Sequence, residues 1–404
     1  MQSFIVNSKS LFTALQLASK TVVKNPVVPI IEDYLFQVSG NRVVISGTDL
    51  QTTLRAVLPI DGNKETFSFV VPPSIVKYLQ KLDEQPVILE STIVSEQETN
   101  KQGVKQIAPD GTPIMHHNCT VTLIDEDGRA NYSGCAYYKD FPLAPECNAL
   151  LMHAQTDFVA EFKDMLNYVS TNELRPAMSG INFASFGKTF ELCATDGHRI
   201  KKSNVTDLIT VNDELCANFI LPAKPAKILS SLKLKTDTLQ VFVKRNDSSA
   251  IVNVKFTGVA DGIDFELIAR TIDERYPDYN NVIPQGNGTT QFTINNKKSF
   301  LKLIDKALLF ANKTTHQIRI ALNGKNQISA EDLDFQNEFV AVVPDSSYSG
   351  KEIEIGFNAE FIKEIVTGVS DTFTFEFTAP NKAGVIRDGR ATIIVMPVMI
   401  NKYV

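Results

Sequence analysis

Apolar residues along this chain recur with two different periods. A spacing of three to four residues, as in Leu11, Leu15 and Ala18, predicts amphipathic helices. Alternation of apolar and polar residues, as in TFTFEFT at 372–378, predicts strands with one buried face. The helical segments predicted from this spacing, or from a proline in a first helical turn, are 8–20, 73–82, 157–169, 222–233, 296–313 and 359–367. The chain is therefore predicted to have an α+β fold.

The predicted elements recur three times in the same order. A strand that ends in an acidic turn occurs at 43–50, 190–197 and 327–333, and its aspartates are Asp49, Asp196 and Asp332. A strand that runs into a short helix occurs at 67–79, 219–229 and 355–365, and its aligned lysines are Lys77, Lys227 and Lys363. Such internal repeats indicate a tandem array of similar domains. Because the aspartate recurs in the repeats, we interpret it as part of a turn rather than of a unique site.

Aromatic–proline turns mark the predicted domain boundaries. Phe141-Pro142 closes the first unit and Tyr276-Pro277 closes the second, which gives domains at 1–148, 149–287 and 288–404. The first unit is longer than the others because of a polar, turn-rich stretch at 95–118, which we predict to be a surface hairpin or loop insertion. A generic α+β repeat array that forms no ring is the alternative interpretation of the repeats.

Composition narrows the class of protein. The 404 residues are 43% hydrophobic and 21% charged, as in a globular chain with several cores. No secretory leader and no membrane-spanning stretch are evident. The cysteines are odd in number and form no C-x-x-C pair; they are Cys119, Cys135, Cys147, Cys193 and Cys216. We therefore expect a reduced, cytoplasmic protein with free thiols.

Charge is unevenly distributed along the chain. The net charge is −6, which by itself argues weakly against a nucleic-acid partner. The predicted helices nevertheless carry a net positive charge, so the remainder is more acidic than the whole. If the helices share one face, they form a basic surface for DNA phosphates. Lysine is also a good helix former on solvated faces, which is the plainer explanation. The lysines predicted to face DNA are Lys9, Lys20, Lys24, Lys77, Lys81, Lys224, Lys227, Lys297, Lys298, Lys302 and Lys306.

Three short motifs carry a resemblance to a known family. They are T-D-G-H-R at 195–199, R-Y-P-D-Y at 275–279 and V-M-P at 395–397. With the repeats, they make the whole chain resemble the bacterial DNA sliding clamp, the beta subunit of DNA polymerase III. The resemblance implies three similar clamp domains in tandem, with helices on the inner face and antiparallel sheets outside. Two chains would join head to tail as a homodimeric ring around duplex DNA.

The resemblance also implies partners and a site. The ring would be a processivity factor that holds DNA without sequence preference. It would tether the DNA polymerase III alpha subunit, the clamp loader and other proteins with a clamp-binding motif. The partner-peptide pocket carried over by motif comprises Arg175, Met178, Thr195, Gly197, His198, Arg199, Ile200, Pro277, Val282, Ile394, Val395, Met396, Pro397 and Val398. Asn281 stands where the family often has a basic residue, and the tail after Pro397 is longer than the family pattern.

Catalytic signatures are missing from the sequence. It contains no phosphate-binding G-x-x-x-x-G-K-[ST] loop, no G-x-G-x-x-G, no H-E-x-x-H and no G-x-S-x-G. His116 and His117 are adjacent but lack a third nearby ligand, so we expect no metal site and no cofactor. We therefore expect a non-catalytic accessory subunit. A further alternative is a protein-interaction ring that does not bind DNA, which the basic helices argue against.

Overall fold

The computed structural model describes residues 2–60, 65–100, 105–186, 189–211, 217–235, 238–284, 290–332 and 337–400. Two compact units make up the chain. The first comprises Met1–Thr156 and Ser231–Arg270, and the second comprises Asp157–Ser230 and Thr271–Val404. Cys216 and the predicted boundary at 287/288 lie outside the described residues. Within the described ranges, no helix is long and apolar enough to cross a membrane.

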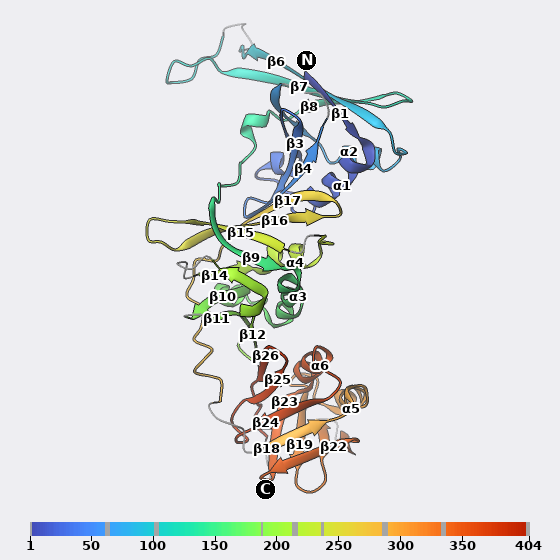
Figure 1. Ribbon diagram of the computed structural model, residues 1–404, viewed down its shortest axis with the longest axis vertical. Coiled ribbons are helices and arrows are strands. Elements are labelled where there is room, and N and C mark those ends of the chain that lie inside the picture. Colours follow the sequence, from blue (N-terminus) through green and yellow to red (C-terminus); the bar gives the residue numbers. More distant parts are fainter. Residues whose placement is uncertain are drawn as a thin grey trace. The chain divides into compact units, whose positions relative to one another are not determined.

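Among its described residues, the first unit contains two helices and two antiparallel sheets (Figure 1). Its helices are α1 (Ser8–Ala18) and α2 (Ser74–Leu79), with 3-10 turns η1 (Pro29–Glu32) and η2 (Tyr138–Asp140). Its strands are β1 (Gln2–Asn7), β2 (Tyr34–Ser39), β3 (Arg42–Thr48), β4 (Thr52–Pro59), β5 (Thr66–Val71), β6 (Pro86–Gln97), β7 (Met115–Ile124), β8 (Arg129–Cys135), β9 (Ala149–Gln155), β15 (Thr238–Arg245), β16 (Ile251–Ala260) and β17 (Ile263–Arg270). One sheet has the order β1-β6-β7-β8, and the other runs β9-β15-β16-β17-β4-β3-β2-β5. Helix α1 packs on β3 and β4.

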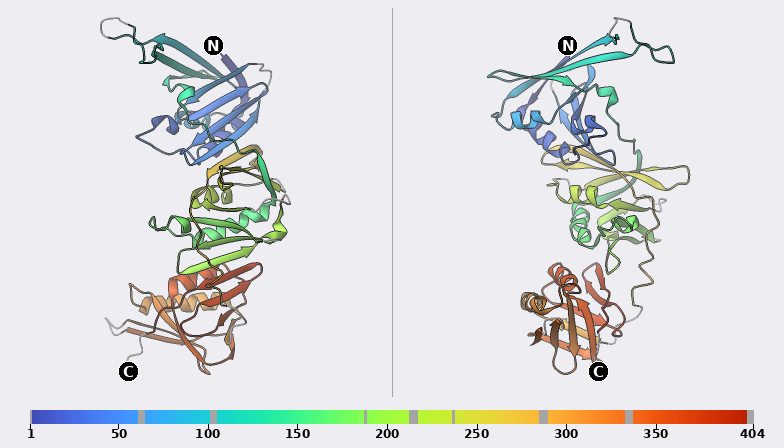
Figure 2. Two further views of the ribbon diagram at one scale, coloured as in Figure 1. Left: turned by 90° about the vertical axis from the view of Figure 1, so that its left-hand side faces the viewer. Right: turned by 180° about the vertical axis from the view of Figure 1, so that it is seen from behind.

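The second unit has the same kinds of element (Figure 2). Its helices are α3 (Thr156–Met165), α4 (Ala223–Ser230), α5 (Lys297–Phe310) and α6 (Ala359–Thr367), with 3-10 turns η3 (Leu166–Tyr168), η4 (Pro176–Met178) and η5 (Thr206–Leu208). Its strands are β10 (Gly180–Phe186), β11 (Thr189–Thr195), β12 (Arg199–Asn204), β13 (Ile209–Val211), β14 (Asn218–Pro222), β18 (Thr290–Ile294), β19 (Gln317–Leu322), β20 (Gln327–Asp332), β21 (Asn337–Val342), β22 (Ser346–Gly350), β23 (Ile353–Asn358), β24 (Phe373–Phe377), β25 (Gly384–Asp388) and β26 (Ala391–Val395). One sheet has the order β14-β10-β11-β12-β26-β25-β24-β18-β22, and a smaller one has the order β21-β20-β19-β23.

Asparagine caps fix the starts of three helices. The side chain of Asn7 accepts hydrogen bonds from the backbone N–H groups of Lys9 and Ser10 at the start of α1. Asn296 accepts one from Ser299 before α5, and Asn358 caps α6 in the same way as Asn7 caps α1. Each cap satisfies backbone donors that the helix cannot, which stabilises it by about 1 kcal/mol. The six predicted helical segments are all helical, and the helices end within a few residues of the predicted limits.

Phenylalanine dominates the core beneath the helices. Phe158 and Phe162 of α3 meet Phe183 of β10 in T-shaped contacts, with ring centroids 5.9 and 5.7 Å from that of Phe183. In the C-terminal part of the chain, Phe300 of α5 packs edge-on against Phe373 of β24, 5.9 Å away. Full burial of one such side chain contributes about 1.5–3 kcal/mol. The 3.6-residue pattern of the sequence therefore marks the helix faces that cover the sheets.

Each large sheet crosses from one predicted repeat to the next. In the first unit, β4 pairs with β17, so that Thr53 lies opposite Ile268. In the second unit, β12 pairs with β26, so that Arg199 lies opposite Val395. Because strands of the middle repeat join both sheets, the compact units do not follow the predicted boundaries. The division at 149 and 288 remains a prediction.

The stretch at 95–118 continues the β6–β7 hairpin. Strand β6 extends to Gln97 and β7 begins at Met115. Isolated bridges join Thr99 to Lys105 and Ile107 to Pro113, which carries the pairing outward. Residues 101–104 of the stretch lie outside the described ranges.

Candidate functional site

A tight turn after β11 forms the centre of the candidate site. Asp196 accepts hydrogen bonds from the backbone N–H groups of His198 and Arg199, at 2.8 and 2.7 Å. Gly197 has a φ of +90°, which favours glycine. A Cβ atom on Gly197 would lie 2.8 Å from Arg175 Nη1 and 4.0 Å from Met178 Sδ. The predicted pocket residues Arg175 and Met178 therefore lie directly beside this turn.

Phe361 and Met396 extend this surface. The exposed imidazole of His198 stacks on the ring of Phe361, with centroids 5.7 Å apart. The backbone N–H of Met396 donates to the His198 carbonyl oxygen at 2.9 Å, and the Met396 side chain is 39% exposed. Met178, Gly197, His198, Phe361 and Met396 together are called the His198 surface below. Sequence reasoning missed Phe361; its only signal was its place in the third repeated strand–helix motif.

Arg199, a predicted pocket residue, is held by several polar contacts. Its side chain is buried, and its Nε and Nη2 atoms donate to Asp196 Oδ2 at 3.0 and 2.9 Å. It also donates to the Asn167 carbonyl oxygen at 3.1 Å and to Glu364 of α6. Burial by itself would lower the Arg199 pKa, but the hydrogen bond that Arg199 donates to Glu364 and the charge of Asp196 raise it above its ordinary value. Arg199 therefore joins α6 to β12 behind the His198 surface.

The aromatic ring of Phe361 links these two layers. The Arg199 guanidinium lies 4.5 Å from the Phe361 ring centroid and 5.4 Å from that of Tyr168. Such cation–π contacts contribute about 0.5–2 kcal/mol, depending on their exposure. The buried arginine thus holds one face of Phe361, while His198 stacks on the same side chain. The His198 surface is therefore held in place by Arg199, a buried residue that a ligand need not contact.

Several predicted pocket residues are buried rather than exposed. Ile200 and Ile394 lie opposite each other on β12 and β26 and pack with Cys193 and Tyr279. Thr195 and Val395 are also buried. Pro277 is half-buried in the turn that Tyr276 and Tyr279 pack around, and the neighbouring Val282 is exposed. The structure therefore separates the predicted set into an exposed surface and the core that supports it.

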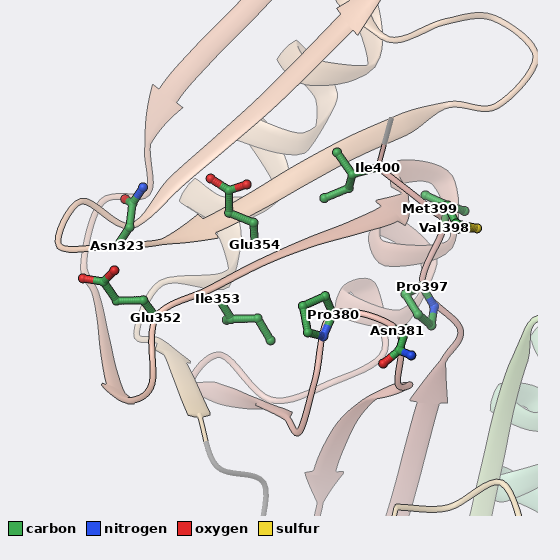
Figure 3. A pocket seen from close by; sticks show the side chains of 10 residues that line it. All are labelled: Asn323, Glu352, Ile353, Glu354, Pro380, Asn381, Pro397, Val398, Met399 and Ile400. Atoms are coloured by element: carbon green, nitrogen blue, oxygen red, sulfur yellow. The ribbon is translucent and has the colours of Figure 1, made fainter. Parts of the chain in front are cut away.

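The last described residues line a hollow in the C-terminal part of the chain (Figure 3). Val398 donates its backbone N–H to the Gly356 carbonyl oxygen at 2.9 Å, so the tail runs beside β23. A hollow of about 760 Å³ lies along it, lined by Asn323, Glu352, Ile353, Glu354, Pro380, Asn381, Pro397, Val398, Met399 and Ile400. The predicted residues Pro397 and Val398 belong to this hollow.

Most of the predicted DNA-facing lysines are exposed. On α5, Lys298, Lys302 and Lys306 recur every four residues opposite the buried face of the helix. Lys297 differs, because its Nζ donates to the Val369 carbonyl oxygen at 2.6 Å and the residue is half-buried. The other predicted lysines, all exposed, are Lys9, Lys20, Lys24, Lys77, Lys81, Lys224 and Lys227.

One histidine of the pair in the hairpin, His117, is engaged in packing. His117 Nδ1 lies 2.7 Å from Ser95 Oγ, and its ring stacks on Tyr137 at 3.7 Å. In the part of the chain that the structure describes, no three His, Cys, Asp or Glu side chains are grouped to hold a metal ion. These contacts give His117 a structural role in the hairpin.

Comparison with known proteins identifies the family. Residues 2–105 match the DNA polymerase III beta subunit, N-terminal domain, and residues 280–400 match the C-terminal domain of the same subunit. The beta sliding clamp of Haemophilus influenzae is 23% identical over 369 residues, which cover 91% of this chain and 90% of that protein. The beta sliding clamp of Bacillus subtilis is 24% identical over 374 residues, 89% of this chain and 88% of that protein.

Solved structures show the same fold. The crystal structure of the DNA polymerase sliding clamp from Pseudomonas aeruginosa with ligand superposes with a TM-score of 0.82 at 18% identity, covering 99% of this chain and 100% of that one. The DNA polymerase III beta subunit from Thermotoga maritima gives a TM-score of 0.76 at 19% identity, with the same coverage. The two domain matches together span more than half of the sequence. The chain belongs to the family of DNA polymerase III beta subunits, the bacterial beta sliding clamps.

Proposed function

We propose that this DNA sliding clamp, a non-catalytic processivity factor, holds duplex DNA through its basic helix faces and binds partner peptides at the His198 surface. It acts in the cytoplasm as a head-to-tail homodimeric ring and needs no cofactor. Its partners are the DNA polymerase III alpha subunit, the clamp loader and other proteins with a clamp-binding motif. The three predicted domains form the repeating segments of the ring.

The single observation that carries the DNA-binding proposal is the exposed lysine row on α5. Lys298, Lys302 and Lys306 have no ion-pair partner among the described residues, whereas Lys363 of α6 is paired with Asp305 at 2.6 Å. Free ammonium groups at four-residue spacing can contact phosphates without reading bases. Such contacts release counterions, so the affinity must fall steeply with salt. A salt titration of DNA binding, with and without these lysines, tests this function.

Exposed aliphatic and aromatic side chains support the peptide-binding proposal. Met396 adapts to different ligand shapes because its side chain is unbranched and polarizable. The neighbouring ring of Phe361 is held between His198 and Arg199. A short peptide with apolar side chains would bury them here while the backbone of the site stays fixed. Only moderate affinity is expected, since ordering the peptide offsets much of the gain.

Apolar residues at a sheet edge support the proposed dimer. Strand β21 is the last strand of its sheet in the described part of the chain, and Val340 and Val342 on it are exposed. Leu309 of α5 is 71% exposed, and the neighbouring Phe310 stacks on Phe339 of β21 at 5.7 Å. An exposed apolar edge is a ready template for another strand. The first-domain edge of a second copy would cover it and continue the sheet.

A protein-interaction ring without DNA binding remains the competing function. It would keep the His198 surface and the dimer but would not need the lysine row on α5. An absence of salt-dependent DNA binding, together with normal peptide binding, would favour this alternative.

A further inference from the structure

The turn at the centre of the His198 surface has a counterpart in the first unit with the same pattern of hydrogen bonds. Asp49 accepts hydrogen bonds from the backbone N–H groups of Gln51 and Thr52 at 3.0 and 2.6 Å. In the second unit, Asp196 makes the equivalent bonds to the residues two and three positions later. The threonine before each aspartate accepts from the N–H two positions later at 3.1 Å in both turns.

The duplication extends to the neighbouring strand. Arg270 donates its backbone N–H to the Gln51 carbonyl oxygen at 2.9 Å, as Met396 does to His198 at the same distance. Thr53 pairs with Ile268 across β4 and β17, as Ile200 pairs with Ile394 across β12 and β26. Even the backbone conformation is shared, because Leu50 has a φ of +74° where Gly197 has +90°. A left-handed leucine is unusual and is held here by its surroundings.

A pocket lies at this duplicate turn. It has a volume of about 360 Å³, and its walls include Leu50, Pro142, Leu143 and Ile268. Leu50 and Leu143 are 47% and 65% exposed, so apolar surface faces solvent here. Pro142 belongs to the aromatic–proline turn that closes the first predicted repeat, as Pro277 does for the second. The pocket therefore lies beside the same kinds of turn and strand as the proposed partner site. Every lining residue belongs to the first unit.

One position of this pocket differs in charge from its counterpart at the His198 surface. Arg270 occupies the backbone position that Met396 occupies in the second unit. Its guanidinium is exposed, and among the described residues it has no ion-pair partner. The described residues that line the pocket include no acidic side chain. Arginine binds carboxylates through paired hydrogen bonds, so this lining is complementary to an anionic group next to an apolar one.

We propose that this pocket is a second peptide-binding site, which takes a short extended segment of a partner protein bearing an apolar side chain beside a carboxylate. The apolar side chain contacts Leu50, Leu143 and Ile268, and the carboxylate pairs with Arg270. The likeness to a peptide site rests on the function proposed for the His198 surface, but the binding itself does not. A ring of two chains would then carry two kinds of site with different charge preferences, and partners could occupy both at once.

Isoleucine methyl groups distinguish the two sites in one NMR experiment. The full chain is labelled at isoleucine methyls, and the Ile268 and Ile394 signals are assigned by Ile268→Val and Ile394→Val. The probes are the tripeptide acetyl-Leu-Phe-Asp-amide and its uncharged match acetyl-Leu-Phe-Asn-amide. We expect the aspartate peptide to shift the Ile268 signal at millimolar concentration. Arg270→Gln should weaken this binding by about three- to tenfold, the range for a charge-assisted bond at a partly solvated site.

Matched controls keep the outcomes separable. Arg42→Gln makes the same charge change at another exposed arginine of the first unit and should leave the titration unchanged. The asparagine peptide should bind wild type and Arg270→Gln equally. An unmoved Ile268 signal would overturn the proposal, and so would equal affinity of the aspartate peptide for wild type and Arg270→Gln. Failure of the His198 surface would instead appear as an Ile394 signal that no polymerase-derived peptide shifts.

Discussion

The backbone N–H of Met396 donates to the carbonyl oxygen of His198 across 2.9 Å. This bond brings a residue from the end of the third repeat beside the central turn of the second. The exposed thioether and the exposed imidazole consequently share one surface, although 198 positions separate them in the sequence. Partner binding at the His198 surface depends on that proximity.

Truncation of the Met396 side chain tests whether partner peptides bind at the His198 surface. We expect Met396→Ala to lower the affinity for a polymerase-derived peptide by about 1–2 kcal/mol, roughly tenfold, because the peptide loses a buried apolar contact. Calorimetry measures the change. Met115→Ala is the matched control, since Met115 is 42% exposed in the β6–β7 hairpin and should leave the affinity unaltered. Equal losses for both variants would mean that the peptide binds elsewhere.

Neutralising the lysine row tests DNA binding. We expect Lys298→Gln, Lys302→Gln and Lys306→Gln together to weaken binding to any duplex sequence at low salt. Each lost phosphate contact should reduce the slope of log affinity against log salt by about 0.9. Lys297 is left unchanged because its Nζ serves the Val369 carbonyl. The control replaces Lys325, Lys351 and Lys382, which are exposed outside the helices. An identical salt slope for both triple variants would contradict the role of α5.

Arg199 should matter for stability more than for peptide contact. Its removal leaves Asp196 half-buried without its charge partner, so we expect Arg199→Gln to lower the free energy of unfolding by roughly 1–3 kcal/mol. Glu364→Gln should cost less than about 1 kcal/mol, because that carboxylate is 55% exposed. Urea denaturation compares the two. If Glu364→Gln proved as damaging as Arg199→Gln, the buried arginine would not be the main support of this junction.

Asp33 makes the stability of the fold depend on pH in a definite direction. Burial, and secondarily the charge of Glu32, raise the pKa of Asp33 from 3.8 to about 6. The folded state therefore holds the proton more tightly than the unfolded state. The stability that this provides is fully present at low pH and is lost as the pH rises through about 6. We expect Asp33→Asn to match wild type near pH 4 and to exceed it in stability at pH 7, measured as urea midpoints. A variant less stable than wild type at pH 7 would contradict this assignment.

Periodicity in the sequence was enough to predict the local structure. The six helical segments and the repeated order of elements follow from apolar spacing and proline positions, which act within a few residues. The pairing of β12 with β26 could not be predicted in this way, because strand register between distant segments depends on packing of the whole sheet. The same limit hid Phe361, whose contact with His198 exists only after α6 comes to lie beside the turn that precedes β12.

The sequence motifs also could not predict which side chains of the site are exposed to solvent. Thr195, Ile200, Ile394 and Val395 are predicted pocket residues, yet neighbouring strands bury them, and Ile200 and Ile394 also pack with Tyr279. Lys297 is similar, because its position beside the helix cap turns its ammonium group toward a carbonyl rather than toward solvent. A motif selects positions, whereas packing decides which side chains remain available.

The proposed dimer has a simple mass prediction. Light scattering should give twice the chain mass of 44.7 kDa at micromolar concentration. Replacing Leu309 with lysine should shift the mass toward that of the single chain, because a charge would then lie in the apolar edge patch. Leu174→Lys, at a similarly exposed leucine, is the control. If both variants were dimers, the dimer interface would not involve α5 and β21.

Topological retention on DNA tests the sliding clamp most directly. The protein is placed on nicked circular duplex DNA by its clamp loader, separated by gel filtration in high salt, and the DNA is then cut once. A ring around the duplex should elute with the intact circle and leave after linearisation, because it slides off the ends. Retention on the linear DNA, or failure to remain on the circle in high salt, would contradict an encircling clamp.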